Sequence, residues 1–279
     1  MIKTIVVHID GSARQDSRLC AAARLACEHE AHLVGSASTG ISWVDVALLA
    51  GSVEPPVPVV DVDALRATAR QRLEAFTTQA ARLGVASIEA RLAEEDAAFG
   101  LLLQSRYADL LVLSQDPAQA GKGESTPRGL PAHLALHGVR PVLVVPETYG
   151  DAPIAGTVVA GWDGSSQALR AIDAALPLLC RAGSVKLVLV NPDTATGLHG
   201  EEPGADLALY LARHGVPVEV IVERTSATVG ATLVQVARDS GAGLIVAGAY
   251  GHSRYREWVL GGATRELLER APVPLLLAH

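Results

Sequence analysis

The chain contains an internal repeat, and this repeat limits its fold more than any other feature. Residues 5–12, Ile-Val-Val-His-Ile-Asp-Gly-Ser, correspond to residues 158–165, Val-Val-Ala-Gly-Trp-Asp-Gly-Ser. Two further pairs follow in the same order: residues 109–114 with 243–248, and residues 140–146 with 273–279. Matched segments in a conserved order along one chain indicate two copies of one folding unit. Residues 146–156 are rich in Pro and Gly, which favours a linker there. We therefore predict an N-terminal domain of residues 1–150 and a C-terminal domain of residues 151–279.

Within each copy, short apolar runs alternate with helical patterns. In the C-terminal copy the predicted strands are residues 157–162, 185–190, 218–222, 244–247 and the final apolar run. Such alternation requires a parallel sheet with helices on both faces. We predict an α/β fold of two tandem doubly wound domains. Each has a five-stranded parallel sheet flanked by helices, which is a Rossmann-like arrangement with ligands at the carboxyl ends of the strands.

A group of glycines follows the fourth predicted strand of the C-terminal copy. Gly248 and Gly251 come directly after the strand, and nine residues separate Gly251 from Gly261 and Gly262, which lie near the start of a predicted helix over 260–270. Glycine adopts positive φ and lets successive backbone N–H groups approach an anion. The free N–H groups of a helix N-terminus favour an anion as well. The spacing therefore indicates a phosphate site, with a tight strand-to-helix turn as the alternative.

The pattern G-x2-G-x9-G, with Asp163-Gly164-Ser165 before it, resembles the nucleotide loop of the universal stress protein family. The resemblance implies that the C-terminal domain binds ATP or a related adenine nucleotide, with Mg²⁺ as an accompanying ion. By this resemblance Asp163 contacts the adenosine part and Val190 lines the base pocket. The implied nucleotide-binding residues are Asp163, Val190, Gly248, Gly251, Gly261, Gly262 and Ala263.

Two features of the site leave alternatives open. The family usually has Ser or Thr after the third glycine, whereas this chain has Gly262, so one hydroxyl contact to phosphate is missing. Asp163-Gly164-Ser165 is also a typical strand-to-helix turn, in which Asp and Ser act as caps. Asp10 has the same place in the N-terminal copy.

The N-terminal copy does not keep the glycine pattern. Ser114 replaces the first glycine and Pro117 the second, while Arg128 or Gly129 lies near the third, one residue too far along the chain. Proline fixes φ and removes an N–H donor, and Pro131 falls where the next helix should begin. We predict a degenerate nucleotide loop with a structural role in this domain.

The composition argues against nucleic-acid-binding, membrane-spanning and disulfide-rich secreted proteins. The chain is 49% hydrophobic and 19% charged with a net charge of -7, and its scattered cations argue against nucleic acid as a partner. No apolar stretch approaches the roughly 18 residues that span a membrane, and no signal-peptide pattern is evident. Three cysteines provide no disulfide framework, which favours a cytoplasmic location.

Three functions agree with these patterns. The first is a cytoplasmic stress-response regulator that binds an adenine nucleotide without turnover. The second is a scaffold that binds unknown protein partners and no nucleotide. The third is an enzyme with weak ATP hydrolysis or self-phosphorylation, for which we identify no catalytic residue. His133 and His137 share a helix face but lack a third ligand, so no metal site is predicted.

The final strands of the two copies, residues 142–145 and 275–278, are short and wholly apolar. Left uncovered, each would be an exposed sheet edge. Members of the resembled family with one domain commonly dimerise through this strand. We therefore expect an intramolecular pseudo-dimer of the two domains, with a homodimer of whole chains as a further assembly.

Overall fold

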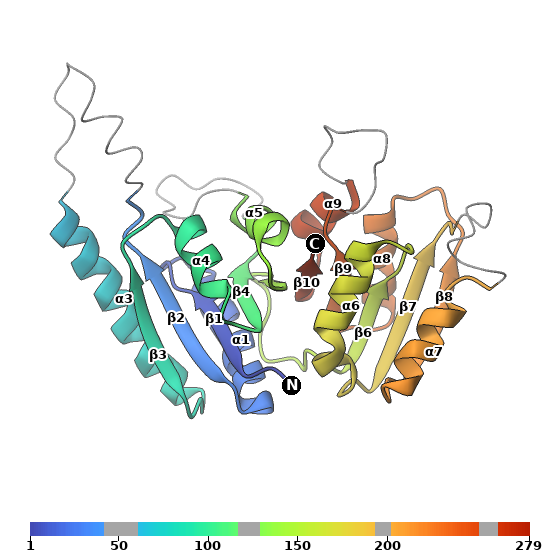
Figure 1. Cartoon of the computed structure of the whole chain (residues 1–279), viewed down its shortest axis with the longest axis horizontal. Coiled ribbons are helices and arrows are strands. Elements are labelled where there is room, and N and C mark those ends of the chain that lie inside the picture. The colour runs from blue at the N-terminus through green and yellow to red at the C-terminus, as the bar shows by residue number, and fades with distance from the viewer. Residues whose placement is uncertain (42–60, 117–128, 193–201, 251–261) are drawn as a thin grey trace, which may run out of the picture.

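The structure is a computed structural model that describes residues 1–41, 61–116, 129–192, 202–250 and 262–279. Among the residues singled out above, Gly251, Gly261, Pro117 and Arg128 lie outside the described residues. The described strands form one ten-stranded sheet, to which each half of the chain contributes five (Figure 1).

The strands of the first half are β1 Thr4–His8, β2 His32–Ser38, β3 Ile88–Ala93, β4 Leu110–Ser114 and β5 Val142–Val145. Those of the second half are β6 Thr157–Gly161, β7 Ser184–Val190, β8 Val218–Glu223, β9 Leu244–Gly248 and β10 Leu275–Ala278. The helices of the first half are α1 Gln15–His29, α3 Val62–Arg82, α4 Ala97–Ser105 and α5 Leu130–His137. Those of the second half are α6 Ser166–Leu179, α7 Ala205–Arg213, α8 Val229–Asp239 and α9 Gly262–Arg270.

The strand order is β3-β2-β1-β4-β5-β10-β9-β6-β7-β8, so the second half repeats the first in reverse across the sheet. All pairs within a half are parallel. This arrangement confirms the predicted α/β fold with two doubly wound halves. The predicted strands of the C-terminal half agree with the structure to within one residue at either end.

The two halves meet through β5 and β10, which pair antiparallel. Leu276 lies opposite Leu143 at the centre of the pairing, and both side chains are buried. The predicted pseudo-dimer through the final strands is therefore present within the chain. Pairing these strands removes an edge from each half-sheet and satisfies backbone groups that water would otherwise have to solvate.

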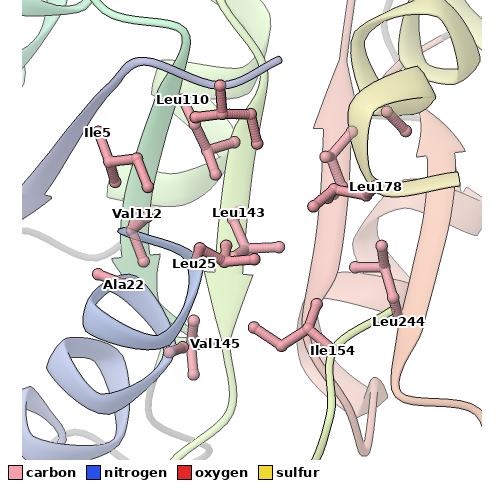
Figure 2. Packing of buried hydrophobic residues seen from close by; sticks show 14 of the residues in the cluster. Ile5, Ala22, Leu25, Leu110, Val112, Leu143, Val145, Ile154, Leu178 and Leu244 are labelled. Atoms are coloured by element: carbon pink, nitrogen blue, oxygen red, sulfur yellow. The ribbon is translucent and has the colours of Figure 1, made fainter. Parts of the chain in front are cut away.

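Two hydrophobic layers cover the sheet. One contains the buried faces of α1, α3, α6 and α7, and the other contains those of α4, α5, α8 and α9. Each layer continues across the junction, because alternate residues of β5 and β10 point to opposite faces. Figure 2 shows the first layer from close by, with Leu143 and Val145 of β5 near Ile154 and Leu178 of the second half.

Local sequence explains where several helices begin. Asp96, Ser165 and Thr228 each accept a hydrogen bond from a backbone N–H of the first turn, which caps α4, α6 and α8. Pro131 lies in the first turn of α5, where a missing N–H costs nothing, so it does not prevent that helix. Among the described helices, none combines the length and the apolar character needed to cross a membrane.

The junction predicts a large effect for Leu276→Asp. The carboxylate would be buried between the two half-sheets without a partner, so we expect the free energy of unfolding to fall by about 3–5 kcal/mol. Denaturant unfolding of the whole chain measures this. Leu209→Asp on the exposed face of α7 is the control, with an expected change of about 0.5 kcal/mol. Equal losses in the two variants would contradict this account of the junction.

Candidate functional site

Three of the sequence-predicted residues meet at one edge of the sheet. Gly248 ends β9, Val190 ends β7, and Asp163 comes two residues after the end of β6. The strand β6 lies between β9 and β7, and the three strands run in the same direction. Their carboxyl ends therefore lie together, which is where doubly wound sheets bind ligands.

The first turn of α9 supplies backbone donors near this edge. Gly262 and Ala263 are its first two residues, and Thr264 is buried directly behind them. The N–H groups of a first helical turn have no acceptor within the helix, and the helix dipole adds positive potential. Such a terminus can hold a phosphate or carboxylate. No described atom lies within 4 Å of the place where a Cβ of Gly262 would stand, so space does not demand glycine there.

Gly248 is explained by close packing with α6. A Cβ at this position would stand 2.5 Å from the backbone nitrogen of Ala168 and 2.7 Å from the carbonyl carbon of Gln167. No side chain tolerates such contacts with backbone atoms, so glycine is what lets α6 begin this close to β9. The contact of Gly248 with phosphate remains a prediction.

The two residues after Gly248 have their N–H groups bound within the protein. The N–H of Ala249 donates to the carbonyl oxygen of Ala278 at 2.7 Å, and the N–H of Tyr250 donates to Oγ1 of Thr264 at 3.1 Å. Tyr250 has a φ of 55°, a left-handed conformation that side chains rarely adopt. Burial raises the pKa of its phenol. Donors for a phosphate must therefore come from α9 and from residues beyond Tyr250.

Asp163 is exposed at the end of β6, and one of its roles is local. Its Oδ1 accepts the N–H of Ser165 at 3.0 Å, while Oγ of Ser165 accepts the N–H of Ala168 at 3.1 Å. The Asp-Gly-Ser segment is thus a capped strand-to-helix turn. This geometry leaves the side chain of Asp163 at the surface, where contact with a ligand stays a prediction.

Val190 is half-buried and packs against the layer that contains α8 and α9. The next residue, Asn191, has a φ of 47°, and its side chain exchanges two hydrogen bonds with the backbone of Thr225. This bridge fixes the ends of β7 and β8 relative to each other. Val190 therefore stands on a rigid part of the edge.

The equivalent place in the first half is filled by the protein itself. Arg18 of α1 is 1% exposed and donates to Oδ1 of Asp10 at 2.6 Å and to Oγ of Ser114 at 3.0 Å. Ser114 in turn donates to the carbonyl oxygen of Arg14 at 3.2 Å. A cavity of about 10 Å³ remains beside these groups, which is room for about one water molecule.

The two halves differ at three matched positions around this place. Ala171 follows Asp163 by eight residues, as Arg18 follows Asp10. Gly161 and Gly248 correspond to His8 and Ser114 in the matched strands. The second half thus has small residues where the first half has a guanidinium, an imidazole and a hydroxyl. The matched residues are His8 and Gly161, Arg18 and Ala171, and Ser114 and Gly248.

Glu266 is a residue that sequence reasoning missed. Its Oε2 accepts hydrogen bonds from Oγ1 of Thr228 at 2.5 Å and from the N–H of Ala231 at 3.1 Å, so it caps α8 from α9. Gly230 makes room for it, since a Cβ there would stand 2.8 Å from the same oxygen. This contact fixes α9 against α8. No local pattern marks it, because the partners are far apart in the sequence.

We predict that Arg18→Ala destabilises the chain by about 3–5 kcal/mol, because it removes the guanidinium that pairs with buried Asp10. Urea unfolding followed by circular dichroism measures the loss. Arg66→Ala provides the control, since Arg66 pairs with Glu94 at the surface and such pairs contribute little. An Arg18→Ala variant as stable as the control would show that the buried pair does not contribute to the free energy of unfolding.

The burial of His8 predicts a pH effect. Burial, and next the charge of Arg18, lower the pKa of His8 from 6.5 to about 3. Below pH 6.5 the unfolded chain takes up a proton that the folded chain does not, so stability is lost as the pH falls towards 3. The loss per pH unit from one such proton reaches about 1.4 kcal/mol.

The matching variant is His8→Asn, which cannot take up that proton. Unfolding measured at pH 7 and at pH 5 should give a smaller loss of stability for the variant than for the unmodified chain. Parallel losses in the two proteins would mean that His8 is protonated in the folded state or does not contribute.

The second half of the chain is similar to a known protein family. Residues 155–279 match the model of the universal stress protein family. A search of the curated proteins gives no match.

Solved structures match the whole chain. A universal stress protein from Archaeoglobus fulgidus DSM 4304 has a TM-score of 0.73 at 15% identity, covering 99% of this chain and 97% of its own. A functionally unknown protein from Pseudomonas aeruginosa PAO1 has a TM-score of 0.57 at 15% identity, covering 99% and 92%. A universal stress protein in complex with cAMP aligns with 53% of this chain and 98% of its own, at 21% identity and a TM-score of 0.36. The second half of this chain, residues 155–279, thus matches the universal stress protein family model, and the first half repeats the same fold in tandem.

Proposed function

We propose that this chain is a cytoplasmic regulator that binds one adenine nucleotide, with ATP as the leading candidate, in its C-terminal half. The proposal includes signalling through the bound state rather than through turnover. The match of residues 155–279 to the universal stress protein family model supports the ligand class. The observation that carries the choice of half is the difference at the carboxyl edge of the sheet, where Arg18 fills one site and Ala171 stands at the matched position of the other.

The phosphates would lie at the N-terminus of α9. The N–H groups of Gly262 and Ala263, in the first turn of the helix, fit an anion there, and Gly251 and Gly261 belong to the same proposed loop. Glu266 would act indirectly, because it holds α9 against α8 and so fixes where those donors point. An ordered terminus lowers the cost of arranging donors when the ligand binds.

The adenosine part would lie towards β6 and β7. Asp163 is exposed at the end of β6, where a carboxylate can accept hydrogen bonds from ribose hydroxyls. Val190 at the end of β7 offers an apolar contact for the base. The neighbouring strands β6 and β7 would thus offer the nucleoside a polar contact from Asp163 and an apolar contact from Val190.

Mg²⁺ would arrive with the nucleotide. Within the described ranges, no three side chains of His, Cys, Asp or Glu group together in a way that could hold a metal. Mg²⁺ commonly keeps several waters and binds through the phosphates of its nucleotide. This mode requires no dedicated protein cage.

A second function, a scaffold for protein partners without nucleotide, is favoured by two observations. The N–H groups of Ala249 and Tyr250 are already bound within the protein, and Gly262 lacks the hydroxyl that the family usually provides. Fewer donors mean weaker phosphate binding. Direct titration separates the two functions.

Isothermal titration with MgATP is expected to find about one site per chain. Asp163→Ala should weaken binding about 10- to 100-fold, which corresponds to about 1–3 kcal/mol for the loss of a charged hydrogen-bond acceptor. Glu219→Ala on the edge strand β8 removes a carboxylate elsewhere and should leave the affinity unchanged. Two equivalent sites would contradict the assignment to one half, and absence of binding at millimolar ATP would favour the scaffold.

A further inference from the structure

An apolar stripe lies on the outer face of α4. Phe99 and Leu103 are 50% and 36% exposed, and Tyr107, just beyond the helix end, is 83% exposed. These residues are spaced by four, so they follow one face of the helix. Large apolar side chains gathered in this way mark an interaction surface more often than scattered ones do.

The matched helix of the second half shows that the fold does not require this stripe. Counted from the capping residues Asp96 and Thr228, the counterparts of the three residues on α8 are Ala231, Gln235 and Asp239. Gln235 donates a hydrogen bond to Asp239 at 2.8 Å, as is usual for a solvated helix face. These three positions therefore carry large apolar residues in the first half and small or polar residues in the second.

Two arginines and one more apolar residue extend the stripe. Tyr107 and Val139, which is 73% exposed, precede the neighbouring parallel strands β4 and β5 and lie at the same edge of the sheet. Arg106 and Arg140 stand next to them, both exposed. Neither has an ion-pair partner within the described part of the chain.

These cations stand out against the charge of the whole chain. The net charge is -7, and several arginines of the described helices form ion pairs, among them Arg24, Arg66, Arg265 and Arg270. Unpaired cations beside exposed aromatic and aliphatic side chains attract acidic groups and repel basic ones. Tyr and Arg are also the residues that contribute most at protein interfaces.

We propose that the α4 stripe, defined by Phe99, Leu103, Tyr107 and Val139 with Arg106 and Arg140, docks an acidic amphipathic helix of a partner protein. The apolar side of that helix would cover the stripe, since residues spaced by four on one helix pack into the grooves of another. Its Asp or Glu side chains would reach Arg106 and Arg140. The surface lies on α4 and on the segments that follow α4 and precede β5, all in the first half, so the proposal does not depend on nucleotide binding in the second.

The test uses two synthetic peptides and the full chain. One fluorescent peptide repeats Leu at helical spacing with Glu at the other positions, and its counterpart has Lys in place of each Glu. Fluorescence anisotropy should detect binding of the Glu peptide and at least tenfold weaker binding of the Lys peptide. Replacing both arginines, Arg106→Glu with Arg140→Glu, should reverse this preference.

A second variant tests the apolar part. Phe99→Ala, Leu103→Gln and Tyr107→Asp together give α4 the residues that α8 carries at the same places, so the helix should still form. Binding of the Glu peptide should fall at least tenfold. Gln235→Ala on α8 is the matched control and should leave binding unchanged.

Several results would overturn the proposal. These are no binding of the Glu peptide, equal binding of both peptides, or unchanged preference after charge reversal. Binding of the chain to vesicles of phosphatidylserine and phosphatidylcholine without binding of the Glu peptide would assign the surface to lipid instead. If the triple variant fails to fold, charge reversal at the exposed Arg106 and Arg140 decides the question by itself.

Discussion

The antiparallel pairing of β5 with β10 is the constraint on which the rest of the structure depends. Each is a four-residue apolar strand, and each would be an open edge if its half stood by itself. Their pairing joins two parallel sheets into one and lets both hydrophobic layers run through the junction. The linker keeps the two halves close, so the effective concentration of one half near the other is high. Pairing within the chain is therefore favoured over pairing between chains. The last strand of each half thus also joins the two halves to each other.

Pseudo-symmetry about this junction places two equivalent sets of carboxyl strand ends in one molecule, and the residues at these ends differ. Asp10 is buried with Arg18, whereas Asp163 is exposed and Ala171 stands in the place of the arginine. Burying an ion pair costs desolvation, and the hydrogen bonds that Arg18 donates to Asp10 and Ser114 offset part of this cost. The first half therefore uses its own side chain where the second keeps a surface carboxylate. The two matched places therefore differ in burial and in charge.

The sequence predicted the strands, the repeat and the junction because these depend on local apolar patterns and turn residues. Residues whose role depends on distant neighbours were not predictable in this way. The close packing of Gly248 on the backbone of α6 is one such role. Glu266 caps a helix that precedes it by many residues, and Arg18 reads as an ordinary member of an alanine-rich helix. An alignment of the two copies identifies Arg18 as unusual, because the matched position of the second copy is Ala171.

The different chemistry of the two edges has a thermodynamic consequence for the whole chain. A ligand that binds only the folded state stabilises it by an amount that grows with the logarithm of its concentration. The buried pair of Arg18 and Asp10 stabilises the first half regardless of ligand, whereas a nucleotide at α9 would act on the second half alone. Since the hydrophobic layers continue through β5 and β10, stabilisation of the second half also opposes unfolding of the first. One filled site can therefore make the stability of both halves respond to nucleotide concentration.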